Sequence, residues 1–274
     1  MTPFGTRLRT AMDARGPLCA GIDPHPSLLE EWGLTDDANG LEKFTMTAVE
    51  GLAGTAAAVK PQSAFFERHG SAGIAVLERA VQASRDLGAL VVLDVKRGDI
   101  GSTAQAYADA YLHPSAPLFV DAITASPFLG MGSLDPMLDT AAGSGAGVFV
   151  LALTSNPEGP QFQHARTRDG GTVAGSVLAA LAARNAGSLL GSFGAVVGAT
   201  IGGTAEDLDI GGPLLVPGVG AQGGSAESVR LIFGPAARNV LPSSSRELLG
   251  AGPDVAALRA AAEHAAEQFA ALAR

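Results

Sequence analysis

The stretch LVVLDVKRGDI, residues 90–100, begins with a run of apolar side chains and ends in a cluster of charges. Side chains alternate between the two faces of a strand. The apolar residues at positions 91, 93 and 95 should therefore face covering helices, while Asp94 and Lys96 point the other way. A strand that is apolar on both faces until its last residues is typical of a parallel sheet buried on both sides.

Apolar runs of strand length recur on either side of this stretch, at residues 18–23, 56–64, 118–125, 147–154, 193–200, 214–219 and 238–243. The segments between them mostly show helical spacing, for example at residues 71–87, 102–112 and 253–272. We therefore expect strand and helix to alternate eight times. This pattern predicts an α/β fold, a single-domain (β/α)₈ TIM barrel over residues 1–274 with a short N-terminal helix. A doubly wound sheet is the alternative.

The composition limits the classes of partner. Only 16% of the 274 residues are charged and the net charge is −9, which argues against a surface that binds nucleic acid. It does not exclude one small anion held in a pocket. The only cysteine, Cys19, rules out an intrachain disulfide and fits a reducing, cytoplasmic setting. The N-terminus does not have the pattern of a signal peptide, and residues 189–203 are too few to cross a bilayer, so we expect no membrane association.

Charged residues end the first three predicted strands. In barrels of this kind the chemistry lies at the C-terminal ends of the strands. Asp23, Lys60, Asp94 and Lys96 should all point inward there, so that charges of alternating sign converge on one cavity. Structural ion pairs are the alternative, but burial costs several kcal/mol per unpaired ion, which favours a functional reason to keep them. Lys96 lies between two carboxylates and should stay an ammonium that can donate a proton.

Residues at the ends of the seventh and eighth strands suit an anion. The segment PGVGAQGG, residues 217–224, can turn backbone N–H groups toward a phosphate, and SSSR, residues 243–246, adds hydroxyls and a guanidinium. The glycine spacing also resembles a dinucleotide fingerprint, but residues 238–243 contain no acidic residue for the ribose. The polar loop at residues 154–171 is interpreted as a lid, with a surface excursion as the alternative. The histidine spacing indicates no metal site.

Taken together, these motifs resemble the orotidine 5′-phosphate decarboxylase family, and in particular its longer bacterial subgroup. The resemblance rests on Lys60, on D-x-K-x-x-D-I-x-x-T at residues 94–103, on the loop at residues 217–224 and on Ser245-Arg246. Residues 21–24, 60–67 and 154–157 fit as well, and the match extends from residue 18 to about residue 248. The D-x-K-x-x-D motif alone is shared with sugar-phosphate decarboxylases, whereas the whole combination is specific.

The resemblance implies the removal of CO₂ from orotidine 5′-phosphate to give UMP, the last step of de novo pyrimidine nucleotide synthesis, with no cofactor and no metal. Lys96 would protonate pyrimidine C6, Asp94 would lie against the departing carboxylate, and Lys60 would bind Asp94 and a ribose hydroxyl. The expected substrate-binding residues are Asp23 on the ribose, Ser126 on the pyrimidine edge, Gln222 and Arg246 on the phosphate, and Ile100, Pro217, Gly218 and Gly223. Asp99, as a catalytic residue, and Thr103 would reach the ribose of the partner subunit's site, which implies a homodimer.

Two other functions compete with this one. A metal-dependent sugar-phosphate decarboxylase or aldolase would carry an acidic metal ligand where this chain has Lys60. A catalytically silent phosphate-binding barrel would have no need of the Asp94, Lys96 and Asp99 set.

Overall fold

The computed structural model describes residues 1–220 and 224–272. Eight parallel strands close into a barrel in sequence order, and β8 pairs with β1. The strands are β1 (Cys19–Ile22), β2 (Ala58–Pro61), β3 (Leu90–Arg97), β4 (Ala122–Ala125), β5 (Gly147–Leu153), β6 (Phe193–Val197), β7 (Leu214–Pro217) and β8 (Val240–Ser244). The predicted barrel is confirmed, and the doubly wound sheet is wrong.

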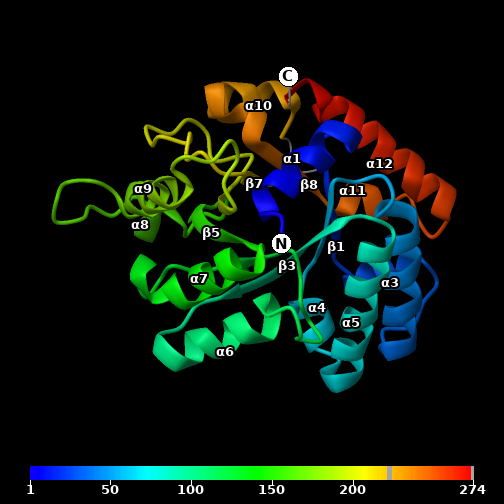
Figure 1. The fold of residues 1–274 in the computed structure, drawn as a ribbon. Coiled ribbons are helices and arrows are strands. Elements are labelled where there is room, and N and C mark those ends of the chain that lie inside the picture. Colours follow the sequence, from blue (N-terminus) through cyan, green and yellow to red (C-terminus); the bar gives the residue numbers. More distant parts are fainter. Residues whose placement is uncertain (221–223, 273–274) are drawn as a thin grey trace.

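Helices surround the strands, as Figure 1 shows. They are α1 (Phe4–Arg15), α2 (Pro26–Glu31), α3 (Ala38–Leu52), α4 (Ala64–Glu67), α5 (Gly70–Asp86), α6 (Gly101–Leu112), α7 (Asp135–Ser144), α8 (Pro160–Gln163), α9 (Val173–Asn185), α10 (Ala226–Phe233), α11 (Arg246–Leu249) and α12 (Val255–Phe269). Short 3₁₀ turns cover Met131–Leu134, Gly234–Asn239 and Ala270–Leu272. None of the helices in the described ranges has the length and apolar character needed to cross a membrane.

The expected eightfold alternation of strand and helix fails between β6 and β7. Residues 198–213 form turns and bends there in place of a helix. The side chain of Asn185 supplies part of the missing hydrogen bonding, because its Nδ2 donates to the carbonyls of Phe193 at 2.7 Å and Ile210 at 3.0 Å. Its Oδ1 accepts the backbone N–H of Phe193 at 3.2 Å. The glycine content of this connection disfavours a helix, and one buried amide holds its ends.

Two apolar cores lie on the two sides of the barrel wall. Val91, Leu93 and Val95 pack outward against the helices, as predicted. The inner core joins Val92 to side chains from α1, from the other strands and from the residue before β2, namely Phe4, Leu8, Met12, Cys19, Ala57, Ala58, Ala122, Phe149, Val196, Leu215 and Leu241. The ring of Phe4 meets Phe149 edge to face at 5.9 Å. Helix α1 lies across the centre of the barrel in Figure 1 and closes its N-terminal end, which leaves the opposite end for the site.

Candidate active site

A cavity of about 420 Å³ lies at the C-terminal ends of the strands. Its wall contains Asp23, Lys60, Asp94, Lys96, Pro217, Gly218 and Arg246 from the predicted set. It also contains Val219 of the predicted loop at residues 217–224, and Ser243, Ser244 and Ser245 of the predicted segment at residues 243–246. The remaining lining residues had no predicted role, namely His25, Gln62, Phe65, Thr124, Leu151, Val196, Leu215 and Glu247. The charged ends of the first three strands therefore converge on one cavity, as the side-chain alternation predicts.

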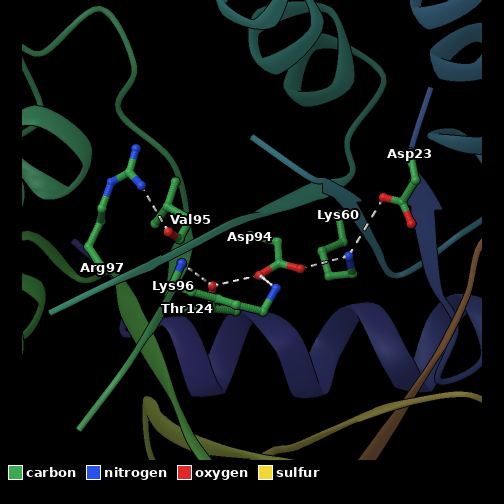
Figure 2. Close-up of polar contacts among 7 residues, drawn as sticks. All are labelled: Asp23, Lys60, Asp94, Val95, Lys96, Arg97 and Thr124. Carbon is green, nitrogen blue, oxygen red and sulfur yellow. Dashed lines mark hydrogen bonds and ion pairs between the residues drawn. The ribbon is translucent and has the colours of Figure 1, made fainter. Parts of the chain in front are cut away.

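Four of the charged side chains form a continuous array of alternating sign, drawn in Figure 2. Lys60 Nζ lies 3.8 Å from Asp23 Oδ1 and 3.3 Å from Asp94 Oδ2. Lys96 Nζ lies 2.6 Å from Asp94 Oδ1. The side chains of Lys60 and Asp94 are each only 8% exposed, whereas that of Lys96 is 46% exposed and faces the open part of the cavity. The array thus has a buried, fixed end and an accessible ammonium.

The array keeps its inner members charged. Burial raises the pKa of Asp94, but the ammonium groups of Lys60 and Lys96, with hydrogen bonds from Lys96 and Thr124, outweigh this and bring it to about 2. Burial lowers the pKa of Lys60, and the carboxylates of Asp23 and Asp94 more than reverse that effect, so its pKa is raised. A carboxylate and an ammonium therefore stand side by side in a largely desolvated site.

The backbone at Lys96 takes a conformation that is uncommon for a residue with a side chain. Its φ is 45°, in the left-handed region, and the pairing of β3 with β4 shifts register between Leu93 and Arg97. Thr124 on β4 supports this turn, because its Oγ1 accepts the Lys96 N–H at 2.9 Å and donates to Asp94 Oδ1 at 2.8 Å. Sequence reasoning missed Thr124, although alternation from the inward-facing Ala122 would have placed it in the cavity.

The part of the cavity wall next to β8 carries the hydroxyls and the guanidinium that the sequence predicts for an anion. Ser243 and Ser244 end β8, and Ser245 and Arg246 follow. The hydroxyl of Ser245 is buried and has no hydrogen-bond partner among the residues that the structure describes, so it is available to a ligand. Gly21 permits this arrangement, since a Cβ there would stand 2.6 Å from that of Ser245. Gln222 and Gly223, which we also expect here, lie outside the described residues.

Four predicted site residues do not line the cavity. Asp99 and Ile100 follow β3 on the loop, and Thr103 is exposed on the first turn of α6. Ser126, just after β4, is half-buried, and its N–H donates to the Arg97 carbonyl at 2.8 Å. The roles of Asp99 and Thr103 in a partner's site, of Ile100 in substrate binding and of Ser126 on the pyrimidine stay predictions.

The loop at residues 154–171 lines a separate cavity of about 350 Å³ between the ends of β5 and β6. This loop contains α8. Its first residue, Thr154, is held by Gln163, whose Oε1 accepts a hydrogen bond from the Thr154 N–H at 2.9 Å. Its assignment as a lid over the charged array stays a prediction.

His25 and Phe65 form one wall of the charged cavity that the sequence argument missed. Their rings meet at 4.2 Å between centroids, and both follow strands that carry array members, β1 and β2. Burial is the main effect on His25 and lowers its pKa. The Asp23 carboxylate offsets this in part and the Arg246 guanidinium adds to it, so the pKa of His25 is lowered overall. The position of His25 directly after Asp23-Pro24 at a strand end was the available signal.

Residues 16–261 match the family model described as "Orotidine 5'-phosphate decarboxylase / HUMPS family". The orotidine 5′-phosphate decarboxylase of Streptomyces coelicolor is 62% identical over 271 residues, which covers 98% of both chains. That of a Nocardioides species is 65% identical over 253 residues, covering 91% of this chain and 92% of its own.

Among solved structures, a Streptomyces avermitilis protein assigned as orotidine 5′-phosphate decarboxylase is 60% identical, with a TM-score of 0.98. The match covers 100% of this chain and 96% of that one. The OMP decarboxylase of Leishmania donovani is 30% identical, with a TM-score of 0.76 and 99% of both chains covered.

Proposed function

Because the chain belongs to the orotidine 5′-phosphate decarboxylase / HUMPS family, we propose that its charged cavity converts orotidine 5′-phosphate to UMP and CO₂. The observation that carries this function is the Asp23–Lys60–Asp94–Lys96 array, which faces an anion-binding wall across one cavity. The substrate has a carboxylate at one end and a phosphate at the other, and the cavity has a counterpart for each.

The chemical step requires a charge on carbon to be stabilised. The bond between pyrimidine C6 and the carboxylate breaks, CO₂ leaves, and the electron pair remains on C6. Lys96 Nζ then transfers a proton to C6 and regains one from water. Because the pair on C6 is not delocalised into a carbonyl, fixed charges that are already oriented before the reaction are the main resource, and no cofactor is required.

The inner array explains why Lys96 is in place before the substrate binds. Asp94 is held by Lys60, Thr124 and Lys96, so its carboxylate has little freedom to reorient. It directs the Lys96 ammonium and lies against the substrate carboxylate. Binding energy from the phosphate, at Arg246 and Ser245, offsets the cost of bringing two anionic groups together.

The remaining groups are assigned to the sugar and the base. Asp23 Oδ1 is buried without a hydrogen-bond partner in the described part of the chain, which suits it to accept a ribose hydroxyl next to Lys60. Ser126 is assigned to the pyrimidine edge. Asp99 and Thr103 are assigned to the partner's site in a cytoplasmic homodimer, and their place outside their own cavity supports this. Ile100 is assigned to substrate binding.

A direct assay tests the function. Purified protein and orotidine 5′-phosphate should give the absorbance change of conversion to UMP at the same rate with and without EDTA. Loss of turnover in EDTA would favour metal-dependent sugar-phosphate chemistry. No UMP from pure, folded protein would overturn the proposal and favour a silent phosphate-binding barrel.

A further inference from the structure

Arg97 directly follows Lys96, but its side chain lies outside the cavity. Figure 2 shows it leaving β3 on the side opposite to the Lys96 ammonium. Its Nη2 lies 2.6 Å from Glu67 Oε1 on α4 and 3.5 Å from Tyr111 Oη on α6. Its Nη1 donates to the Val95 carbonyl at 3.3 Å. The guanidinium is 5.5 Å from the centre of the Tyr107 ring, also on α6. One side chain thus ties the end of β3 to two helices.

These contacts close a ring around the segment that carries Asp94 and Lys96. The Ser63 N–H donates to the Asp94 carbonyl at 3.2 Å, and Ser63 Oγ donates to Glu67 Oε1 at 2.5 Å. The same Glu67 oxygen accepts a hydrogen bond from Arg97, the residue that follows Lys96 in the chain. The hydrogen bond from Lys96 Nζ to Asp94 completes the ring. We call Ser63, Glu67 and Arg97 the outer clasp. It fixes residues 94–97 from outside the barrel, as Thr124 does from inside.

The outer clasp restrains the chain next to the strained backbone of Lys96. A residue with a side chain holds a φ of 45° only where its surroundings determine it from several directions. The Lys96 N–H is fixed by Thr124, and the following residue is fixed through its carbonyl by Ser126 and through its side chain by Glu67. Without the clasp, the peptide between residues 96 and 97 could rotate toward an unstrained conformation, and Lys96 Nζ would then move away from Asp94.

We propose that Arg97, through Glu67, is a positioning residue that holds Lys96 in its reactive geometry. This inference rests on the proposed function for the role of Lys96, but it concerns a side chain that touches neither substrate nor reacting atoms. The contacts with Tyr107 and Tyr111 place the same guanidinium against α6.

The test compares Arg97→Gln, Arg97→Lys, Glu67→Gln and the double variant Arg97→Gln/Glu67→Gln. Arg184→Gln is the matched control, because Arg184 forms 2.6 Å pairs with Asp135 and Asp139 on α7 at a similar exposure, 34% against 28% for Arg97. We expect kcat to fall about 10- to 100-fold in Arg97→Gln, because displacement of a reacting group by about 1 Å can cost about 100-fold. The KM and the Kd for UMP should stay within about threefold, since the groups that bind phosphate and ribose are untouched.

Two features separate positioning from a general structural effect. Arg97→Lys should recover part of kcat because it keeps the charge that meets Glu67, and the double variant should be no slower than the slower single variant. The proposal is overturned if Arg97→Gln keeps the kcat of Arg184→Gln, if Kd for UMP rises in step with the loss of kcat, or if lysine restores nothing.

A crystal structure of Arg97→Gln separates this inference from the proposed function, because it needs no turnover. Movement of Lys96 out of the positive φ region, or of Nζ away from Asp94, would support positioning even in a protein that proved to have another activity. Retention of both features would refute positioning even if the wild type converts orotidine 5′-phosphate.

Discussion

The Thr124 hydroxyl joins the backbone of Lys96 to the carboxylate that Lys96 binds, since Thr124 Oγ1 accepts the Lys96 N–H at 2.9 Å and donates to Asp94 at 2.8 Å. One small side chain on β4 therefore restrains both ends of the interaction between Lys96 and Asp94. Thr124 is 1% exposed, so water cannot readily replace it.

Thr124→Val should lower both stability and turnover, because valine has the same shape but can neither accept nor donate a hydrogen bond. Loss of the hydroxyl removes its hydrogen bonds to the Lys96 N–H and to the buried Asp94 carboxylate, which should cost about 1–3 kcal/mol of unfolding free energy. We expect kcat to fall at least tenfold, measured beside urea unfolding. Thr124→Ser keeps the hydroxyl and should remain within about threefold of wild type. Equal kcat values for the two variants would show that the hydroxyl is not needed.

Lys96→Ala should leave a folded protein that binds UMP with little turnover. The side chain is the accessible end of the array and is 46% exposed, so its removal leaves no large buried void. Loss of a general acid and of a fixed charge together should lower kcat by about 10³-fold or more. Circular dichroism and UMP titration would check folding and the remainder of the site. A variant that kept a tenth of wild-type turnover would refute the role assigned to Lys96.

The Asp94 carboxylate should make part of the protein's stability dependent on pH. Burial raises its pKa, and Lys60 and Lys96 lower it to about 2, below the value of roughly 3.9 for an unfolded chain. A carboxyl with a depressed folded pKa contributes stability that is fully present above about pH 4 and is lost as pH falls through about 2. The contribution is on the order of 2 kcal/mol.

Urea unfolding of wild type and Asp94→Asn between pH 2 and 7 measures this contribution. The wild type should lose more stability than the variant as the pH falls below about 4. Asp109→Asn, at an exposed position on α6, serves as the control for general acid sensitivity. Parallel pH curves for wild type and Asp94→Asn would show that the array does not hold Asp94 in its ionised form.

At the closed end of the barrel, Arg7 on α1 pairs with the buried Asp121, which also accepts the Val91 N–H at 2.9 Å. Arg7→Ala leaves that carboxylate without its cation and should destabilise the protein by about 3 kcal/mol, near the lower end for a buried pair because Arg7 is 29% exposed. Thermal unfolding would measure the loss, and kcat below the transition should not change. Arg79→Ala, whose ion pair with Glu42 is exposed on both sides, should cost well under 1 kcal/mol. Equal losses would contradict this assignment.

Side-chain alternation explains why so much of the site could be predicted from the sequence. Strands with a period of two and a barrel with its chemistry at one end were enough to bring Asp23, Lys60, Asp94 and Lys96 together. The outer clasp could not be predicted in this way. Its contact between Glu67 and Arg97 depends on where α4 begins and on the turn at Lys96. Side-chain alternation assumes regular strands, so it predicts neither of these features.

Closure of the barrel by α1 was hidden for a related reason. Phe4, Leu8 and Met12 indicate one apolar helix face, but the partner of that face is the inside of the barrel, which is made of residues from distant strands. The missing helix between β6 and β7 shows the opposite case. The glycines near residues 202 and 211 were a local signal that no helix forms there. The expectation that a helix follows every strand of the barrel led us to overlook it.

Sharing of sites between subunits is the remaining prediction. Asp99→Ala and Lys96→Ala should each be inactive alone, because each lacks one member of every site. If Asp99 acts in the partner's site, a mixed dimer has one site that lacks both side chains and one that is intact. Random exchange of equal amounts yields half mixed dimers, so we expect about a quarter of wild-type activity in the mixture.

Tagged subunits and native mass spectrometry would establish that exchange has occurred. Mixing Asp94→Ala with Lys96→Ala is the control, since both residues lie in the same subunit's cavity, Nζ to Oδ1 at 2.6 Å, and no mixed dimer restores a complete site. Recovery in the first mixture alone supports a shared site. Verified exchange without recovery would place Asp99 outside the partner's site, and recovery in both mixtures would mean that the loss reflects folding rather than chemistry.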